Sequence, residues 1–154
     1  MDHPTLLLEL TGDIWTYHDH DNWIVIPTNG DVNRQGLAVM GRGVALQVAN
    51  RYPEFRKEFA DLLTTIGNRV IKFPQYAMFT FPVKHHWHEA ADLTLIERSA
   101  YELVNMPRRS MVYLPRVGCG NGRLSWSVVR PVLERAFGDE VGGFTVVSLP
   151  GGGS

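Results

Sequence analysis

Two glycine-rich segments are the parts of this sequence best suited to bind an anion. The first spans residues 36–43 (Gly-Leu-Ala-Val-Met-Gly-Arg-Gly) and the second spans residues 118–122 (Gly-Cys-Gly-Asn-Gly). Glycine lets backbone amides turn toward a ligand and lets that ligand approach closely. Each segment leads from an expected strand into an expected helix, whose first amides lack partners and favour negative charge. Together they predict a diphosphate site; the alternative is that each segment is only a tight connection.

Two well-known phosphate motifs do not fit these segments. The first segment has the spacing of a Walker-A motif, but Arg42 and Gly43 replace its lysine and its hydroxyl residue. Neither segment completes a dinucleotide-binding fingerprint, because Leu46 and Arg123 occupy the positions of the third glycine. The sequence therefore disfavours a nucleoside triphosphatase and a hydride-transferring Rossmann enzyme.

Lys84 is one of three lysines between the two segments, and a lysine could act on a bound ligand in two ways. An amine that is partly desolvated in a cleft has a lowered pKa and becomes nucleophilic near neutral pH. A protonated amine could instead stabilise negative charge on a leaving group or a phosphate. A third alternative is an ordinary exposed lysine at the end of a strand, which is the commoner case.

The histidines and the single cysteine raise the question of a metal site. His85 and His86 are neighbours in an expected extended segment, so their side chains would point to opposite sides, while His18 and His20 lie in an early loop. The only thiol, Cys119, sits between two glycines, where we expect a small turn residue and not a nucleophile. We therefore predict no metal and no cofactor, with zinc as the alternative.

Strands and helices alternate along the chain, which predicts an α/β fold. Strands are expected over residues 5–10, 23–27, 69–73, 76–81, 110–115 and 144–149. Helices are expected over residues 44–52, 54–63, 93–104 and 128–137, with Pro131 near the first turn of the last one, where its missing amide costs least. One domain should occupy residues 1–150, followed by a flexible tail over residues 151–154.

Composition excludes several classes of protein. The 154 residues carry 15 basic and 16 acidic side chains, so an extended basic surface that tracks nucleic acid is not expected. A single cysteine excludes an intramolecular disulfide and fits a reducing compartment. We see no apolar stretch long enough to span a membrane and no secretory signal, and we expect a cytoplasmic monomer.

Four motifs, taken in their order along the chain, resemble the macrodomain family of ADP-ribose-binding modules. They are Gly12-Asp13-Ile14, the expected strand that ends at Asn29, the segment over residues 40–47, and the segment over residues 114–126. The resemblance implies a three-layer α/β/α sandwich with a central mixed sheet. It also implies an ADP-ribose ligand, with Asp13 and Ile14 at the adenine and Asn29 at the distal ribose. The implied binding residues are Asp13, Ile14, Asn29, Met40, Gly41, Arg42, Gly43, Val44, Ala45, Gly118, Cys119, Gly120, Asn121 and Gly122.

A further segment resembles one branch of that family. Residues 81–87 (Phe-Pro-Val-Lys-His-His-Trp) match the Phe-Pro-x-Lys-x-x-Trp signature of the ADP-ribosyl glycohydrolase macrodomains. This branch includes the DNA-directed DarG-type antitoxin and the terminal ADP-ribose glycohydrolase, and it implies that Lys84 is catalytic at the distal ribose. Gly122 replaces an aspartate of the terminal glycohydrolase, which favours the DNA-directed relatives. Residues 30–37 are longer than the corresponding turn in that antitoxin.

The resemblance implies an enzyme that removes ADP-ribose from a modified macromolecule, with nucleobase-linked ADP-ribose on DNA as the favoured substrate and modified protein as another. Arg34, Arg42 and Arg123 would then touch the DNA strand only lightly. Three alternatives share the same pocket: a non-catalytic ADP-ribose reader, an ADP-ribose 1″-phosphate phosphatase and an O-acetyl-ADP-ribose deacetylase.

Overall fold

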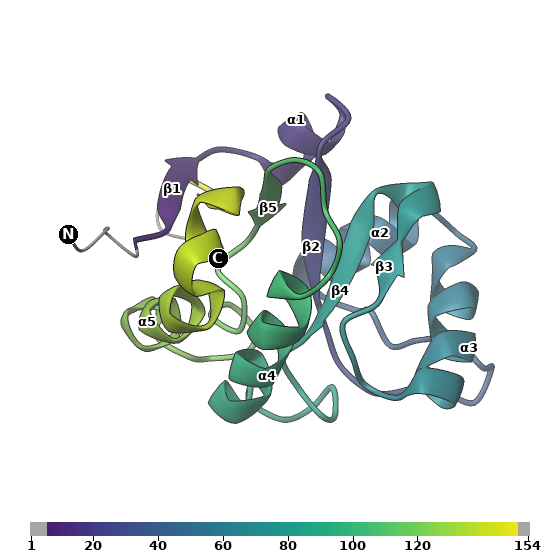
Figure 1. Ribbon diagram of the computed structural model, residues 1–154. Helices are drawn as coiled ribbons and strands as arrows, with labels where there is room; N and C mark the ends of the chain where they lie inside the picture. Colours follow the sequence, from purple (N-terminus) through teal and green to yellow (C-terminus); the bar gives the residue numbers. More distant parts are fainter. Residues whose placement is uncertain (1–5, 151–154) are drawn as a thin grey trace.

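A six-stranded sheet forms the centre of the computed structural model, which describes residues 6–150 (Figure 1). The strand order is β1-β6-β5-β2-β4-β3, and every neighbouring pair is parallel except the antiparallel pair of β3 and β4. The strands are β1 (Leu8–Thr11), β2 (Trp23–Thr28), β3 (Lys72–Phe73), β4 (Met78–Pro82), β5 (Val112–Leu114) and β6 (Phe144–Ser148). The expected mixed sheet is therefore confirmed. Thr5, at the start of the first expected strand, and the glycine tail over residues 151–154 lie outside the described residues.

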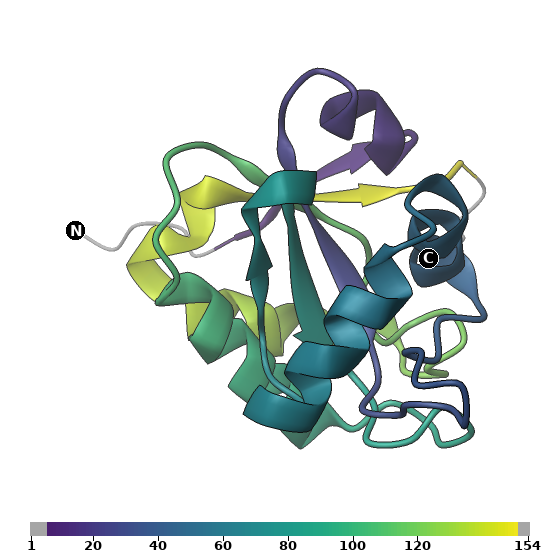
Figure 2. The same cartoon turned by 90° about the vertical axis from the view of Figure 1, so that its right-hand side faces the viewer.

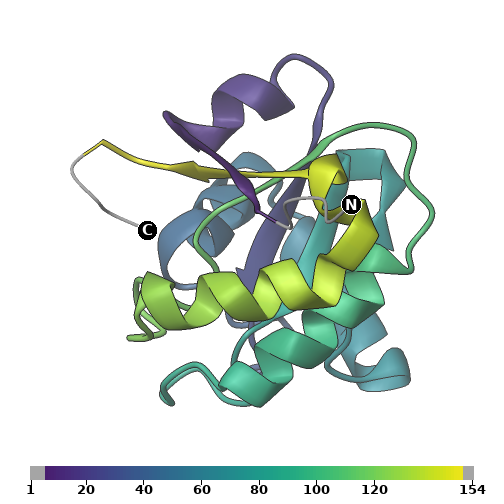
Figure 3. The same ribbon diagram turned by 60° about the vertical axis from the view of Figure 1, so that its left-hand side comes forward.

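Helices cover both faces of this sheet, as Figure 2 shows from the side. The helices are α1 (Ile14–His18), α2 (Gly43–Arg51), α3 (Phe55–Ile66), α4 (Leu93–Val104) and α5 (Trp126–Phe137). On one face α4 and α5 run side by side, which is clearest in Figure 3, and on the other face lie α2 and α3. The molecule is thus a three-layer α/β/α sandwich.

The apolar strands contribute side chains to two separate cores, one on each side of the sheet. Along β2, Val25 joins the core under α4 and α5, while Ile24 and Ile26 join the core under α2 and α3. Successive side chains of a strand point to opposite faces, so a strand covered on both sides must be apolar throughout. This explains why the sequence shows short apolar runs in place of alternating polar residues.

The structure differs from the predicted elements in three places. Residues 14–18 form the short helix α1, where only a loop was expected. Strand β3 begins at Lys72 and not at residue 69, and the amide of Ile71 donates to the hydroxyl of Thr80. The expectation for Pro131 is wrong: α5 begins at Trp126, so Pro131 is its sixth residue and lies inside the helix.

Three loops emerge from the carboxyl ends of neighbouring parallel strands. Strand β2 lies between β5 and β4, and the segments that follow these strands gather at one edge of the sheet, at the lower right of Figure 2. This edge is where open α/β sheets bind their ligands. Within residues 6–150, no helix has the length and apolar character needed to cross a membrane.

Candidate active site

A cavity of about 280 Å³ opens between these three loops. Its walls include Lys84 and both glycine-rich segments, so the structure brings together residues from three separate parts of the sequence. The predicted site residues that line it are Asn29, Met40, Gly41, Arg42, Gly43, Val44, Ala45, Lys84, Gly118, Gly120, Asn121 and Gly122.

The first glycine-rich segment ends in the amino terminus of α2. Gly43 starts this helix with φ of +58°, and no side chain caps it. Because the first amides of a helix have no carbonyl one turn before them, those of Gly43, Val44 and Ala45 are available to an anion.

The second glycine-rich segment also presents free amides to the cavity. Within residues 6–150, the amides of Gly120, Asn121 and Gly122 donate no hydrogen bond. The side-chain oxygen of Asn121 accepts a hydrogen bond of 3.4 Å from the Arg42 guanidinium, which links the two segments. Two facing sets of free amides are the arrangement that a diphosphate requires.

Gly122 has no room for a side chain. A Cβ atom at this position would lie 2.4 Å from the carbonyl oxygen of Gly118 and 2.8 Å from the Cβ atom of Ala91. The amide of Ala91 also donates to the carbonyl of Gly122, which fixes the loop against the start of the α4 segment. The loop therefore excludes a carboxylate at this position as long as its backbone keeps this path.

Lys84 follows β4 by two residues and is half-buried in the cavity wall. Its Nζ atom donates a 3.3 Å hydrogen bond to the carbonyl of Trp87. Burial lowers the pKa of Lys84 from the ordinary lysine value, and the charges of Arg123 and Arg42 lower it further. Both effects increase the fraction of uncharged amine, which is the nucleophilic form.

The segment over residues 30–39 braces the loop that carries Lys84. The Asp31 carboxylate accepts one hydrogen bond from the His86 ring and one from the Trp87 amide, both of 2.8 Å. Gly30 donates to the carbonyl of His85 at 3.2 Å. Burial alone would raise the pKa of Asp31, but the bonds from His86 and Trp87 lower it below its ordinary value. The hydrogen bond to Asp31 in turn raises the pKa of His86.

Known proteins with similar sequences and structures were found, although no family model matches the chain. The DNA ADP-ribosyl glycohydrolase of Mycobacterium tuberculosis is 32% identical over 131 residues, which cover 77% of this chain and 37% of that protein. The protein of the same name from Thermus aquaticus is 29% identical over 131 residues, covering 75% of this chain and 36% of its own length. The chain thus spans little more than a third of these curated relatives.

Solved structures of macrodomains are also similar to this chain. The macrodomain of Mycobacterium tuberculosis DarG matches with a TM-score of 0.71 and 26% identity, covering 94% of this chain and 97% of that one. The macrodomain of Thermus aquaticus DarG matches with a TM-score of 0.71 and 25% identity, covering 94% and 99%. The chain is a DarG-type macrodomain. The expected family and fold class are therefore confirmed.

Three predicted binding residues of this macrodomain do not line the cavity. Asp13 caps α1, since its carboxylate accepts a hydrogen bond of 3.0 Å from the amide of Trp15. Ile14 is buried in the core under α2 and α3. Cys119 is partly buried, and burial raises its thiol pKa to about 11, so it is not a nucleophile near neutral pH. Their contacts with a ligand stay predictions.

The cavity of the macrodomain also has walls that sequence reasoning did not assign to the site. Thr28 closes β2 and its buried hydroxyl has no hydrogen-bond partner within residues 6–150. Its signal in the sequence was its place directly before Asn29 at the end of an apolar strand. Arg116 also lines the cavity, and its guanidinium pairs with Glu9 at 3.4 Å. The remaining wall residues are Pro27, Val39, Val83, Trp87 and Pro115.

Two histidines next to Lys84 bind carboxylates, whereas His18 and His20 bond backbone carbonyls. The His85 ring lies 2.9 Å from the Asp92 carboxylate, and the His86 ring contacts Asp31 as described above. In the part of the chain that the structure describes, no three His, Cys, Asp or Glu side chains converge on one point as metal ligands would.

Proposed function

We propose that this macrodomain is an ADP-ribosyl glycohydrolase that removes ADP-ribose from DNA bases. One observation carries the proposal: the Lys84 amine lines the same cavity as the free amides of both glycine-rich segments. Curated relatives named DNA ADP-ribosyl glycohydrolase support the same activity and substrate.

Each of the three loops binds a different part of the ligand. The diphosphate lies between the free amides at the start of α2 and those of Gly120, Asn121 and Gly122. The distal ribose then extends past Asn29 toward β4, which places the anomeric carbon of the ribose beside Lys84. The Arg42 guanidinium adds positive charge beside the diphosphate.

The chemistry falls to Lys84 because none of the described residues that line the cavity is a carboxylate. The paired carboxyl groups of ordinary glycosidases are therefore not available here. The uncharged amine attacks C1″; the nitrogen–carbon bond forms while the bond to the base breaks, and the electron pair leaves with the base. The base takes up a proton from solvent and the lysine nitrogen loses one, which leaves a glycosylamine. The bond from C1″ to the ring oxygen then breaks, the ring oxygen takes up a proton, and an imine with the ring-opened ribose forms. Water hydrolyses this imine, which restores Lys84, and the released ADP-ribose closes its ring again.

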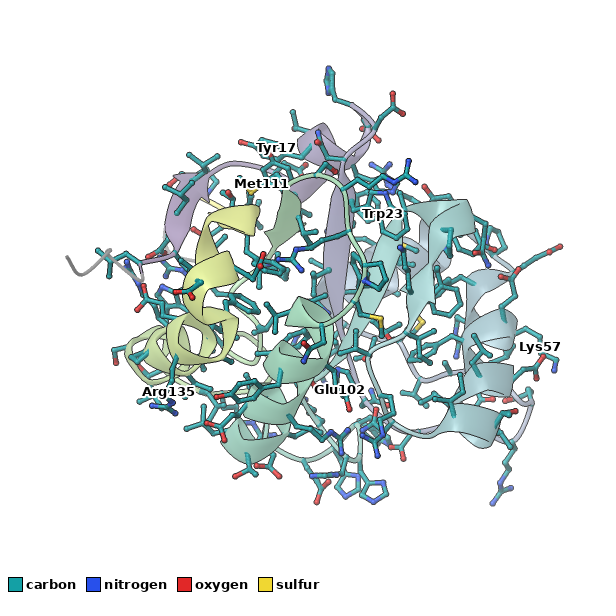
Figure 4. All side chains as sticks on the ribbon, in the orientation of Figure 1. Tyr17, Trp23, Lys57, Glu102, Met111 and Arg135 are labelled. Atoms are coloured by element: carbon teal, nitrogen blue, oxygen red, sulfur yellow. The ribbon has the colours of Figure 1, made fainter. Side chains whose placement is uncertain are left out.

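Release of ADP-ribose from modified single-stranded DNA tests this proposal. The wild-type protein should free ADP-ribose from an oligonucleotide modified on a base, and Lys84→Ala should abolish release while keeping the wild-type melting temperature. Lys57→Ala is the matched control, since Figure 4 shows Lys57 on the outer side of α3. Full activity of Lys84→Ala would refute the role of the lysine. Binding of ADP-ribose without any release by the wild type would identify a reader instead.

Residues of one chain line the whole described cavity, which supports a site that needs no partner copy. The active form that we propose is accordingly a monomer. Size-exclusion chromatography with light scattering at assay concentrations should give a mass near 17.4 kDa. A dimer mass would contradict this.

A further inference from the structure

We infer that Trp87 is a stacking platform for the leaving base and that Asp31 is the residue that positions it. The inference rests on the proposed function and adds to it the feature by which the site selects a planar leaving group. It is drawn from the exposure of the indole, from its place beside Lys84 and from the contacts that hold its backbone.

Trp87 combines two properties that rarely occur together in a structural tryptophan. Its ring is 54% exposed, yet it lines the cavity that contains Lys84. An exposed indole contributes little to a core, but it offers a large flat face to a planar ligand. Trp87 therefore does not anchor the fold, and its face is available at the mouth of the site.

The backbone of Trp87 also lies beside the amine that we propose as the nucleophile. Lys84 precedes Trp87 by three residues, and its Nζ atom donates to the Trp87 carbonyl at 3.3 Å. Displacement by Lys84 expels the base from the face of C1″ opposite the amine, so the base departs into the cavity away from Nζ. Among the described lining residues, Trp87 offers the aromatic surface that can receive it. A nucleobase presents a π-face to the indole, whereas an acyl group or an amino-acid side chain carboxylate does not.

The backbone that carries the indole is held in place before any ligand arrives. Asp31, with a side chain only 22% exposed, accepts hydrogen bonds from both the Trp87 amide and the His86 ring. Glu89 accepts a 3.0 Å bond from the His86 amide, and the His88 ring meets the indole edge-on at 5.6 Å. A platform fixed in this way loses little conformational freedom when a base stacks on it.

Binding measurements can separate this inference from the catalytic step. In the Lys84→Ala protein, calorimetry with a base-ADP-ribosylated trinucleotide should show about tenfold tighter binding than calorimetry with free ADP-ribose, because only the first ligand carries the base. Adding Trp87→Leu should remove this preference and leave the affinity for free ADP-ribose within about twofold. Adding Trp87→Phe should retain most of the preference. The unmodified trinucleotide measures the contribution of strand contacts alone.

Three results would overturn the platform. They are no preference for the base-linked ligand in Lys84→Ala, a preference that survives Trp87→Leu, and an equal loss of affinity for both ligands in Trp87→Leu, since the ring would then be a wall of the ribose site. None of them depends on turnover, so failure of the proposed function remains visible on its own as a lack of ADP-ribose release by the wild type.

Asp31→Asn tests the positioning role. The carboxamide keeps the size of the side chain but cannot accept both hydrogen bonds through two oxygens. We expect faster hydrogen exchange at the Trp87 amide and a severalfold smaller preference for the base-linked ligand, with unchanged affinity for free ADP-ribose. Asp61→Asn, on the exposed side of α3, is the matched control and should change neither quantity. Unchanged exchange and unchanged preference in Asp31→Asn would refute the role of Asp31.

Discussion

The Lys84 amine lies within electrostatic reach of two guanidinium groups, those of Arg123 and Arg42. Neither arginine is near Lys84 in the sequence, and one of them also bonds Asn121 across the two glycine-rich segments. The same cations that would attract a diphosphate therefore also favour the uncharged form of the amine. Under the proposed mechanism, anion binding and activation of the nucleophile would depend on the same side chains.

Removing one of these cations should shift the pH dependence of the reaction. If the uncharged amine attacks C1″, the rate rises as pH increases through the pKa of Lys84, which is lowered below its ordinary value of 10.5. Arg123→Asn should raise this pKa and move the rising limb to higher pH; asparagine tolerates the φ of +66° at this position. The measurement is a profile of single-turnover rate against pH for both proteins.

Lys57→Gln provides the control, because it removes a positive charge from the surface of α3. Its profile should coincide with that of the wild type. A rate that falls as pH rises through the same range would show that the protonated amine acts, by stabilising charge on the leaving group.

At the scale of elements, the sequence predicted what depends on periodicity and missed what depends on local contacts. Helix α4 has its expected bounds, Leu93–Val104, because four apolar positions recur along one face over three turns. Helix α1 has only five residues, too few for such a pattern. It is capped by Asp13, whose carboxylate accepts a hydrogen bond from the amide of Trp15. The same bond explains why Asp13 is engaged in the fold although the motif marks it as a ligand residue.

The residues of the site show the same contrast between features that a sequence pattern predicts and features that depend on local contacts. The glycine-rich segments were predictable because residue type and spacing mark them, whereas Lys84 was marked by its place in a segment that resembles the glycohydrolase signature. The brace between Asp31 and residues 86–87 was not predictable, since it joins positions 55 and 56 residues apart through a loop without periodicity.

The close packing of the second glycine-rich segment predicts a sharp effect of one methyl group. Gly122→Ala should distort the loop, because its Cβ atom would lie 2.4 Å from a backbone oxygen that cannot move independently. We expect loss of ADP-ribose binding and a melting temperature several degrees lower, measured by calorimetry and thermal unfolding. Gly142→Ala is the control, since a Cβ atom there has open space and ordinary φ. Wild-type affinity in Gly122→Ala would disprove the packing argument.

Glu9 joins β1 to α5 and to the cavity. Its carboxylate accepts from Trp126 Nε1 at 3.0 Å and pairs with Arg130 and Arg116. Glu9→Gln should lower the free energy of unfolding by about 1–2 kcal/mol, because it weakens three contacts of a partly buried group. Urea denaturation measures this.

A single exposed pair is the comparison for Glu9. Asp61 is 64% exposed and pairs with Lys57, which is 59% exposed, so Asp61→Asn should change the free energy of unfolding by less than about 0.5 kcal/mol. Equal effects of the two variants would show that the Glu9 contacts are worth no more than an ordinary surface pair.

At the scale of the whole molecule, a formal net charge of −1 coexists with a positively charged site. Lys84, Arg42 and Arg116 line the cavity, and Arg123 lies within electrostatic reach of Lys84. These positive charges lie where the ADP-ribose group would bind. A modified DNA strand would thus be held mainly through its ADP-ribose, with few contacts to its phosphates.

Salt dependence distinguishes these two modes of binding. With about two phosphate contacts, the logarithm of kcat/KM on modified single-stranded DNA should fall against the logarithm of salt concentration with a slope of about −1 to −2. Assays between low and physiological salt measure this slope. A slope steeper than about −4 would reveal an extended electrostatic interface and contradict the argument from composition.

The order of the strands also determines the distance between the loops that line the cavity. The second glycine-rich segment follows β5 and Lys84 follows β4, and β2 separates these two strands. Neighbouring strands lie about 4.8 Å apart, so two intervals place the strand ends about 10 Å from each other. A ligand shortened by one phosphate could occupy one loop or the other but would fit both poorly. If ADP-ribose binds as proposed, the spacing of the strands would favour a nucleotide long enough to reach both loops.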